Sequence, residues 1–323
     1  MRRESIVYKI LASLALLLLT LSSCIKEDRA GEAISFYPVA AKPTKAIIDG
    51  STYPADESFV ISAYYNASAA TPGSAAYFED CTAAKDGTYW ETSSAEYWPL
   101  AGRLDFYAYS PASAGLTLSA DGVSASSYTI TTAAQMSTDL CYASASVTDC
   151  SAHPDAVPLV FSHALAQVVF RVKAADYYSS IGNTVSLAMT SLSLSGICSV
   201  GNFSAGSWSS LSGEHSYTLS SSSTALTYDG SNNPETTLVG AYLLLPQTLG
   251  ANAALNVGYS ITQSTLGTLS NPPAAISLRG GSITEWLPGR KYVYTLSIGM
   301  EKIITFTAST TDWADDGSGL VVE

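Results

Sequence analysis

The chain has 323 residues with a formal net charge of −12, and 13% of its residues are charged while 47% are hydrophobic. This apolar content is enough to bury a core and excludes an intrinsically disordered chain. Lys and Arg are few and do not cluster, so nucleic acid is excluded as a partner. Once an N-terminal leader is set aside, about 300 residues remain, which is enough for two ordinary domains.

The N-terminus has the features of a lipoprotein signal peptide. Arg2, Arg3 and Lys9 precede an apolar run from residue 10 to residue 21, and Cys24 follows two small residues. The run is too short and wrongly flanked for a membrane-spanning helix. We therefore expect residues 1–23 to be removed and Cys24 to receive a covalent lipid such as palmitate. A buried helix or an uncleaved anchor is the alternative.

Alternating apolar and polar residues predict β-strands through most of the chain. In one run, Leu104, Phe106 and Ala108 alternate with polar or aromatic residues, which is the period of side chains on one face of a strand. Clusters of Gly, Pro, Asn and Ser separate such runs. The fold predicted is all-β, with two tandem β-sandwich domains of the transthyretin-like or Greek-key kind. Further runs of this type occur at residues 59–65, 168–173, 255–261 and 292–298.

A short polar stretch at residues 153–156 is the expected boundary between the two domains, because it has no periodicity and precedes a strongly apolar strand. We expect four parts after this division. They are the signal peptide at 1–23, a lipidated propeptide at 24–45, an N-terminal sandwich at 46–156 and a C-terminal sandwich at 157–323.

Cysteine and histidine usage points to neither catalysis nor a metal site. The four remaining cysteines contain no Cys-x-x-Cys pair, and they could form two disulfides or stay as free thiols; they are Cys81, Cys141, Cys150 and Cys198. No nucleophile elbow, phosphate loop or zinc-protease motif occurs. Residues 312–323 partly match a calcium loop, but Ala314 occupies a ligand position. We expect no enzyme activity, no metal and no cofactor apart from the lipid on Cys24.

The aromatic residues have two interpretations. Five tryptophans and twenty tyrosines could form a platform on which sugar rings stack, or they could pack in cores and interfaces. Most of them are in phase with the strand alternation, which favours packing.

Several segments taken in order resemble the fimbrillin family, the subunits of protease-assembled surface pili. The resemblance extends from Cys24 to the C-terminus. The segments are Glu96-Tyr97-Trp98-Pro99, Leu104-Asp105-Phe106-Tyr107-Ala108-Tyr109, Asp139-Leu140-Cys141-Tyr142-Ala143, the run 157–170, Leu244-Leu245-Pro246-Gln247-Thr248-Leu249 and Trp286-Leu287-Pro288-Gly289-Arg290-Lys291-Tyr292.

This resemblance implies a maturation step. In the family, the first strand of the precursor fills a groove in its own N-terminal domain until a trypsin-like protease removes it. Residues 34–39 would be that strand here, and cleavage is expected between Lys45 and Ala46, because Pro43 protects the bond after Lys42. Arg29 is an alternative cleavage site that would release the lipid and leave the strand in place.

The resemblance also implies that a C-terminal strand of another subunit enters the emptied groove. The expected donor segment contains Trp313, Leu320, Val321 and Val322. The chain is therefore expected to be a stalk or tip pilin on the cell surface, anchored first in the outer membrane by its lipid, with other pilin subunits and the protease as partners. The alternative is a glycan-binding surface lipoprotein, or a basal anchor subunit, that does not polymerise.

Overall fold

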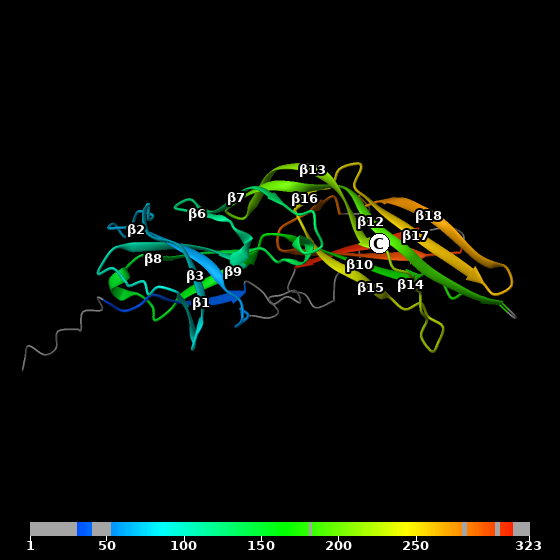
Figure 1. The fold of residues 1–323 in the computed structure, drawn as a ribbon, viewed down its shortest axis with the longest axis horizontal. Coiled ribbons are helices and arrows are strands. Elements are labelled where there is room, and N and C mark those ends of the chain that lie inside the picture. Colours follow the sequence, from blue (N-terminus) through cyan, green and yellow to red (C-terminus); the bar gives the residue numbers. More distant parts are fainter. Residues whose placement is uncertain (1–30, 41–52, 181–182, 280–282, 301–303, 313–323) are drawn as a thin grey trace, which may run out of the picture.

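The structure is a computed structural model, and it describes residues 31–40, 53–180, 183–279, 283–300 and 304–312. Most of the described residues are in β-strands and very few are helical, which confirms the all-β prediction. The molecule is elongated, with a barrel of N-terminal strands at one end and two further sheets at the other (Figure 1). The helical elements described are three short 3-10 turns, η2 (Ala112–Ala114), η3 (Gln135–Ser137) and η4 (Cys150–Ala152).

Seven strands close the N-terminal barrel in the order β1-β4-β3-β2-β5-β8-β9. The sequence predicted a two-sheet sandwich here, and the structure corrects this to one sheet closed on itself. Closure leaves no strand edge open to solvent. The strands are β1 (Ser35–Ala40), β2 (Phe59–Asn66), β3 (Ala75–Asp86), β4 (Tyr89–Thr92), β5 (Arg103–Ser110), β8 (Cys141–Val147) and β9 (Val157–His163).

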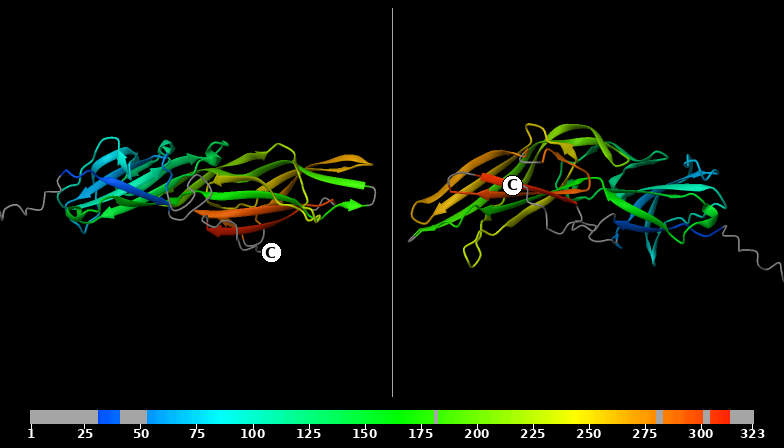
Figure 2. Two further views of the ribbon diagram at one scale, coloured as in Figure 1. Left: turned by 90° about the horizontal axis from the view of Figure 1, so that it is seen from below. Right: turned by 180° about the vertical axis from the view of Figure 1, so that it is seen from behind.

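A four-stranded and an eight-stranded sheet form the second half, and residues of both contribute to one large hydrophobic core. Figure 2 shows the two sheets as separate layers that run along the long axis. The four-stranded sheet has the order β15 (Thr237–Leu244), β10 (Ala166–Ala174), β20 (Arg290–Ile298) and β21 (Ile304–Asp312). The eight-stranded sheet contains β18 (Gly267–Ser277), β17 (Ala254–Gln263), β12 (Asn183–Ser204), β7 (Gly122–Thr129) and β6 (Thr117–Ser119), with β11 (Ser179–Ser180), β13 (Ser207–Ser220) and β14 (Thr224–Ala225) paired to β12. A separate pair joins β16 (Gln247–Thr248) to β19 (Glu285–Trp286).

The sheets do not divide at residue 156. Strand β9, which the sequence analysis placed in the second domain, pairs with β1 and β8 and completes the barrel. Strands β6 and β7 lie within the expected first domain, yet β7 pairs with β12 of the eight-stranded sheet. Strand β9 thus belongs to the barrel although it follows the expected boundary, and β7 belongs to the eight-stranded sheet although it precedes it. A single cut in the sequence cannot separate the two halves.

The packing of β6 and β7 against the barrel buries both faces of two barrel strands. Phe59 and Ile61 of β2 point into the barrel, while Val60 of β2 and its ladder partner Tyr109 of β5 belong to the large core. Strands β6 and β7 pack over these outer faces. The alternation in the sequence predicted half-buried strands, whereas β2 and β5 are buried almost throughout.

The hairpin between β12 and β13 also contacts the barrel. Ala205 and Gly206 form its two-residue turn with φ of 45° and 89°, the left-handed conformation that fits the twist of a hairpin. A side chain on Gly206 would collide with the hydroxyl of Tyr142 on β8. Glycine therefore allows the hairpin tip to lie directly against the barrel.

Candidate functional site: the slot of the N-terminal strand

Strand β1 lies in a slot between two strands that are distant in the sequence. It runs antiparallel to β4, where Phe36 pairs with Trp90, and parallel to β9, where residues 36–40 pair with residues 157–161. Neither neighbour is connected to β1 by a hairpin. Non-covalent contacts alone would therefore hold β1 in place if the chain were cut between β1 and β2.

The side chains of β1 alternate between the core and the solvent. Ile34, just before the strand, and Phe36 are 1% and 0% exposed, and Pro38 is also buried, whereas Tyr37 is 49% exposed. The ring of Phe36 makes edge-to-face contacts with Phe59 and Phe106, with centroids 6.1 and 5.8 Å apart. These alternate side chains fill pockets inside the barrel.

The floor of the slot is made by residues that follow the expected cleavage site. Tyr53 packs against Phe59, Trp90 and Phe161, with ring centroids 5.2 to 5.8 Å apart. Its hydroxyl lies 2.7 Å from the Ser110 hydroxyl, and burial raises the pKa of Tyr53 above its ordinary value. Cleavage at residue 45 would leave this aromatic floor in the mature chain.

A second set of contacts holds the residues just before β1. The Ile34 N–H donates to the Glu96 carbonyl at 2.7 Å, and the Trp98 N–H donates to the Glu32 carbonyl at 3.1 Å. The Trp98 ring stacks on His153 with centroids 4.4 Å apart, and Nε2 of His153 lies 3.6 Å from a carboxylate oxygen of Glu32. These hydrogen bonds and the contact between Glu32 and His153 therefore fix residues 32–34 against the barrel.

A buried carboxylate links three segments at the edge of the barrel. Asp105 of β5 is 2% exposed. Its carboxylate accepts hydrogen bonds from the Gly73 N–H and the Ser146 hydroxyl. It also accepts hydrogen bonds of 2.8 to 3.0 Å from the Arg103 guanidinium. Burial opposes the charged form, but these hydrogen bonds outweigh it and hold the pKa of Asp105 below its ordinary value.

Replacing Asp105 by asparagine is expected to lower the free energy of unfolding by about 2 kcal/mol at pH 7, because charge-assisted hydrogen bonds to Arg103 and Ser146 are lost. A depressed pKa in the folded state stabilises the protein above the ordinary carboxyl pKa of about 3.9, and this contribution disappears as the pH falls through the folded value. Urea denaturation from pH 3 to pH 7 measures the effect. The variant should lose less stability on acidification than the unmodified chain, and equal slopes would contradict the assignment.

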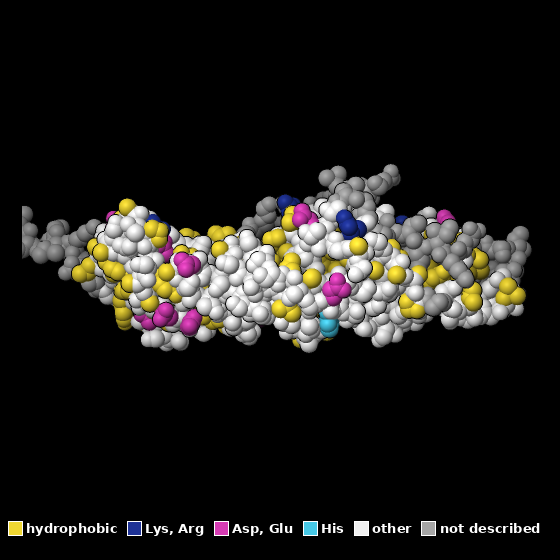
Figure 3. Space-filling model, turned by 90° about the horizontal axis from the view of Figure 1, so that it is seen from above, with side chains coloured by type: hydrophobic (Ala, Val, Ile, Leu, Met, Phe, Trp, Pro, Cys, Tyr) yellow, Lys and Arg dark blue, Asp and Glu magenta, His cyan; other side chains and the backbone are white. Residues whose placement is uncertain are grey.

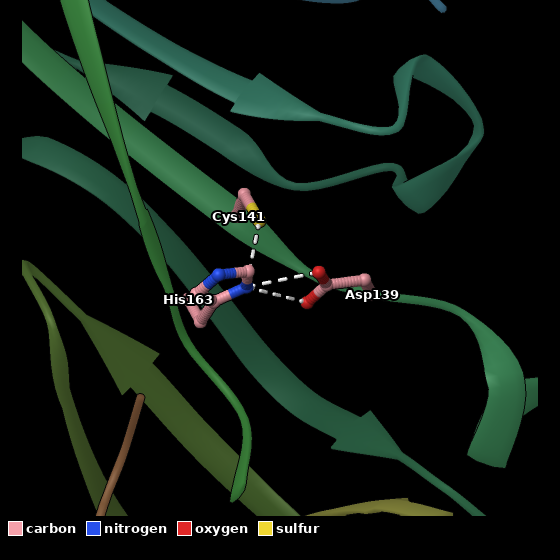
Figure 4. A group of neighbouring side chains, drawn as sticks. All are labelled: Asp139, Cys141 and His163. Atoms are coloured by element: carbon pink, nitrogen blue, oxygen red, sulfur yellow. Dashed lines mark hydrogen bonds and ion pairs between the residues drawn. The ribbon is translucent and has the colours of Figure 1, made fainter. Parts of the chain in front are cut away.

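Asp139, Cys141 and His163 meet where the barrel joins the second half (Figure 4). Nδ1 of His163 lies 2.9 and 3.1 Å from the two carboxylate oxygens of Asp139 and 3.5 Å from Sγ of Cys141. Burial, followed by the negative charge of Asp139, raises the pKa of Cys141 well above its ordinary value. The thiol thus stays protonated at neutral pH, and both partners face one ring nitrogen, so the group is unsuited to nucleophilic catalysis.

The structure covers the expected functional residues unevenly. A strand at residues 35–40 lies in the barrel, close to the expected strand at 34–39. The expected lipidation, cleavage and donor residues lie outside the described residues; they are Cys24, Arg29, Lys45, Ala46, Trp313, Leu320, Val321 and Val322. The sequence alone did not reveal that Asp139, Cys141 and His163 lie together. An Asp-x-Cys spacing on an extended segment was the one local signal of this group, since residues two apart share a face.

All four cysteines described are free thiols. Cys141 and Cys150 are buried and Cys81 and Cys198 are half-buried, and burial raises the pKa of Cys150 to about 11. No helix among the described residues is long and apolar enough to cross a membrane.

The described tryptophans offer little support for a sugar-binding platform. Trp90, Trp98 and Trp286 are 1 to 4% exposed, and Nε1 of Trp208 donates to the Ala164 carbonyl at 2.6 Å. These four tryptophans therefore pack within the molecule, as their phase in the sequence predicted. On the face drawn in Figure 3, charged side chains are sparse and scattered among neutral ones.

A family model described as fimbrillin-like matches residues 44–313, which is most of the chain. The chain belongs to the fimbrillin-like family. Membership confirms the resemblance found in the sequence and makes this fimbrillin a fimbrial or adhesin-type subunit, a structural protein of the cell surface. No curated protein sequence matches it closely enough to add a relative.

Two solved structures share the fold of this chain at low sequence identity, and a third match has a TM-score too low to show a shared fold. A candidate cell adhesion protein from Bacteroides ovatus is 15% identical with a TM-score of 0.50, covering 88% of this chain and 98% of its own. One from Bacteroides eggerthii is 14% identical with a TM-score of 0.50, covering 88% and 97%. The tip fimbrial protein Mfa3 from Porphyromonas gingivalis is 11% identical with a TM-score of 0.39, covering 87% and 99%.

Proposed function

We propose that this fimbrillin is a stalk or tip pilin in which β1 is a removable plug. The observation that carries the proposal is the position of β1. It is the first strand among the described residues, it is bonded on both sides, and it has no hairpin to either neighbour. Cleavage after Lys45 would separate it covalently from every other strand of the barrel.

Loss of the plug would create a strongly unfavourable surface. The edges of β4 and β9 would lose their backbone partners, and the pockets of Ile34, Phe36 and Pro38 would open to water. Open edges and apolar pockets favour addition of another strand. The slot therefore becomes a specific acceptor for an extended segment of another subunit.

The C-terminal segment of a second copy, or of another pilin, is the proposed donor. Eleven residues, 313–323, follow β21 in the sequence, more than the seven from Ile34 to Ala40 that occupy the slot. At roughly 3.3 Å per residue the segment is long enough to replace β1. Leu320 and Val322, two residues apart, would point into the same pockets, and Trp313 and Val321 complete the apolar part.

The precursor is proposed to reach the outer membrane as a lipoprotein acylated on Cys24. Removal of residues 24–45 would then release both lipid and plug in one step. Cleavage after Arg29 would release the lipid and retain the plug, which would leave a surface subunit that cannot accept a donor.

Replacing Lys45 by glutamine tests the processing step. We expect the variant to accumulate at precursor length and to form no ladder of polymers in a gel run under mild denaturation, because a trypsin-like protease cuts after a basic residue. Lys45→Arg is the matched control and should be processed normally. Polymers formed by the glutamine variant with β1 still attached would contradict the proposal. If the unmodified chain also stays monomeric at precursor length, the alternative of a non-polymerising glycan-binding or basal anchor lipoprotein is favoured.

A further inference from the structure

We infer that Asp139, Cys141 and His163 form a binding site for one zinc ion at the junction between the barrel and the second half. The three side chains offer a carboxylate, a thiolate and an imidazole, the ligand types that zinc prefers. Their ligand atoms all lie within 4.8 Å of one another, and no other ligand group of this kind occurs among the residues that the structure describes.

Strand pairing brings these residues together. Cys141, at the start of β8, pairs directly with His163, at the end of β9. Asp139 precedes Cys141 by two residues, and Figure 4 shows its carboxylate on the same side of the chain, directed at the His163 ring. Two ladder positions and the adjoining segment therefore fix the three ligands.

The separation of the sulfur and nitrogen ligands matches a tetrahedral zinc ion. Zinc lies about 2.3 Å from sulfur and about 2.0 Å from nitrogen, so that two such ligands stand roughly 3.5 Å apart. Sγ of Cys141 and Nδ1 of His163 are 3.5 Å apart. The Asp139 oxygens are at hydrogen-bond distance from Nδ1 and would move away by a few tenths of an ångström on binding, roughly the difference from zinc geometry.

Burial and charge also suit a divalent cation. The side chains of Asp139 and His163 are 1% and 6% exposed, and Cys141 is 1% exposed. A thiolate and a carboxylate together carry two negative charges, which zinc would neutralise, so the buried site would have no net charge. Binding would form the zinc–sulfur bond and release the thiol proton to solvent. The fourth position would be taken by water.

The site would fasten the end of the barrel that adjoins the second half of the subunit. The Ala164 N–H donates to the Leu140 carbonyl at 2.7 Å, and the Gly289 N–H donates to the Leu165 carbonyl at 2.9 Å. An ion bound to His163 and Cys141 would fasten the ends of β8 and β9 next to these bonds, at the point where the chain leaves the barrel for β10.

Titration of the tag-free full chain with zinc, in competition with a chromophoric chelator, tests the inference. We expect one zinc ion per chain with submicromolar affinity and a rise in the unfolding temperature of about 5 °C or more. Cobalt should give the near-ultraviolet thiolate-to-metal band and the visible spectrum of a tetrahedral site. Cys141→Ser should lose that band and bind zinc at least 100-fold more weakly, while the control Cys198→Ser should match the unmodified chain.

Two results would overturn the inference. One is binding no tighter than that of a protein without the site. The other is a tight site that survives in Cys141→Ser, which would assign the metal to other residues. If Cys141→Ser does not fold, a chain in which every cysteine except Cys141 is replaced by serine decides, because Cys141 is then the one thiolate that can give the charge-transfer band.

Discussion

Replacing Phe36 by alanine should lower the free energy of unfolding of the unprocessed chain by about 3–5 kcal/mol, the range for removing a fully buried aromatic side chain. Phe36 is 0% exposed and its ring contacts Phe59 and Phe106 inside the barrel. The cavity would lie inside the barrel, beside the rings of Phe59 and Phe106. Urea denaturation followed by tryptophan fluorescence measures the change, because Trp90 and Trp98 report on the barrel.

Tyr37→Ala is the matched control for this experiment. Tyr37 is on the same strand but 49% exposed, so its truncation should change the stability by less than about 1 kcal/mol. After cleavage at residue 45, the peptide carrying Phe36→Ala should also dissociate faster than the unmodified peptide. Similar losses in both variants would mean that β1 is not held by its inward pockets.

Truncation of the chain after Asp312 is expected to abolish polymerisation and leave the monomer folded. The deleted residues 313–323 contain the proposed donor segment, while β21 and the core of the second half remain. Size-exclusion chromatography after protease treatment should show monomers for the truncated chain and polymers for the complete one. The unfolding temperature of the unprocessed monomers should be nearly equal, which separates loss of donation from loss of folding.

Polymerisation of the truncated chain would contradict the assignment of residues 313–323 as the donor. Strand β21 would then be the candidate donor. That strand pairs with β20 and lies at the edge of its sheet, and it has the sequence Ile304-Thr305-Phe306-Thr307-Ala308. The apolar spacing matches Ile34, Phe36 and Pro38 of the plug. Strand β5 has a similar spacing but is bonded on both edges by β2 and β8 and could not be donated.

Local periodicity predicted many of the strands, because alternation along a strand is a property of neighbouring residues. The runs at 168–173, 255–261 and 292–298 became β10, β17 and β20. Periodicity could not predict which surface each face meets. Val60 and Tyr109 lie on the outside of the barrel and are buried because β6 and β7, distant in sequence, cover them.

The domain boundary and the junction site depended on long-range pairing. The polar stretch at 153–156 is a break in the pattern, but β9 after it returns to the barrel because β1 and β8 leave a place between them. His163 comes to Cys141 through that same pairing, across 22 residues of sequence. No short sequence motif predicts such a contact. Asp139, Cys141 and His163 could therefore be recognised as a group only in the folded chain.

N-terminal sequencing of polymers extracted from the cell surface tests the central claim most directly. If β1 leaves its slot and another subunit replaces it, the assembled chains should begin at Ala46 and contain no residues of β1. Polymers whose chains begin at Ala30 or earlier, with residues 34–40 still attached, would contradict the account, because the slot would then be filled by the strand that the structure shows in it.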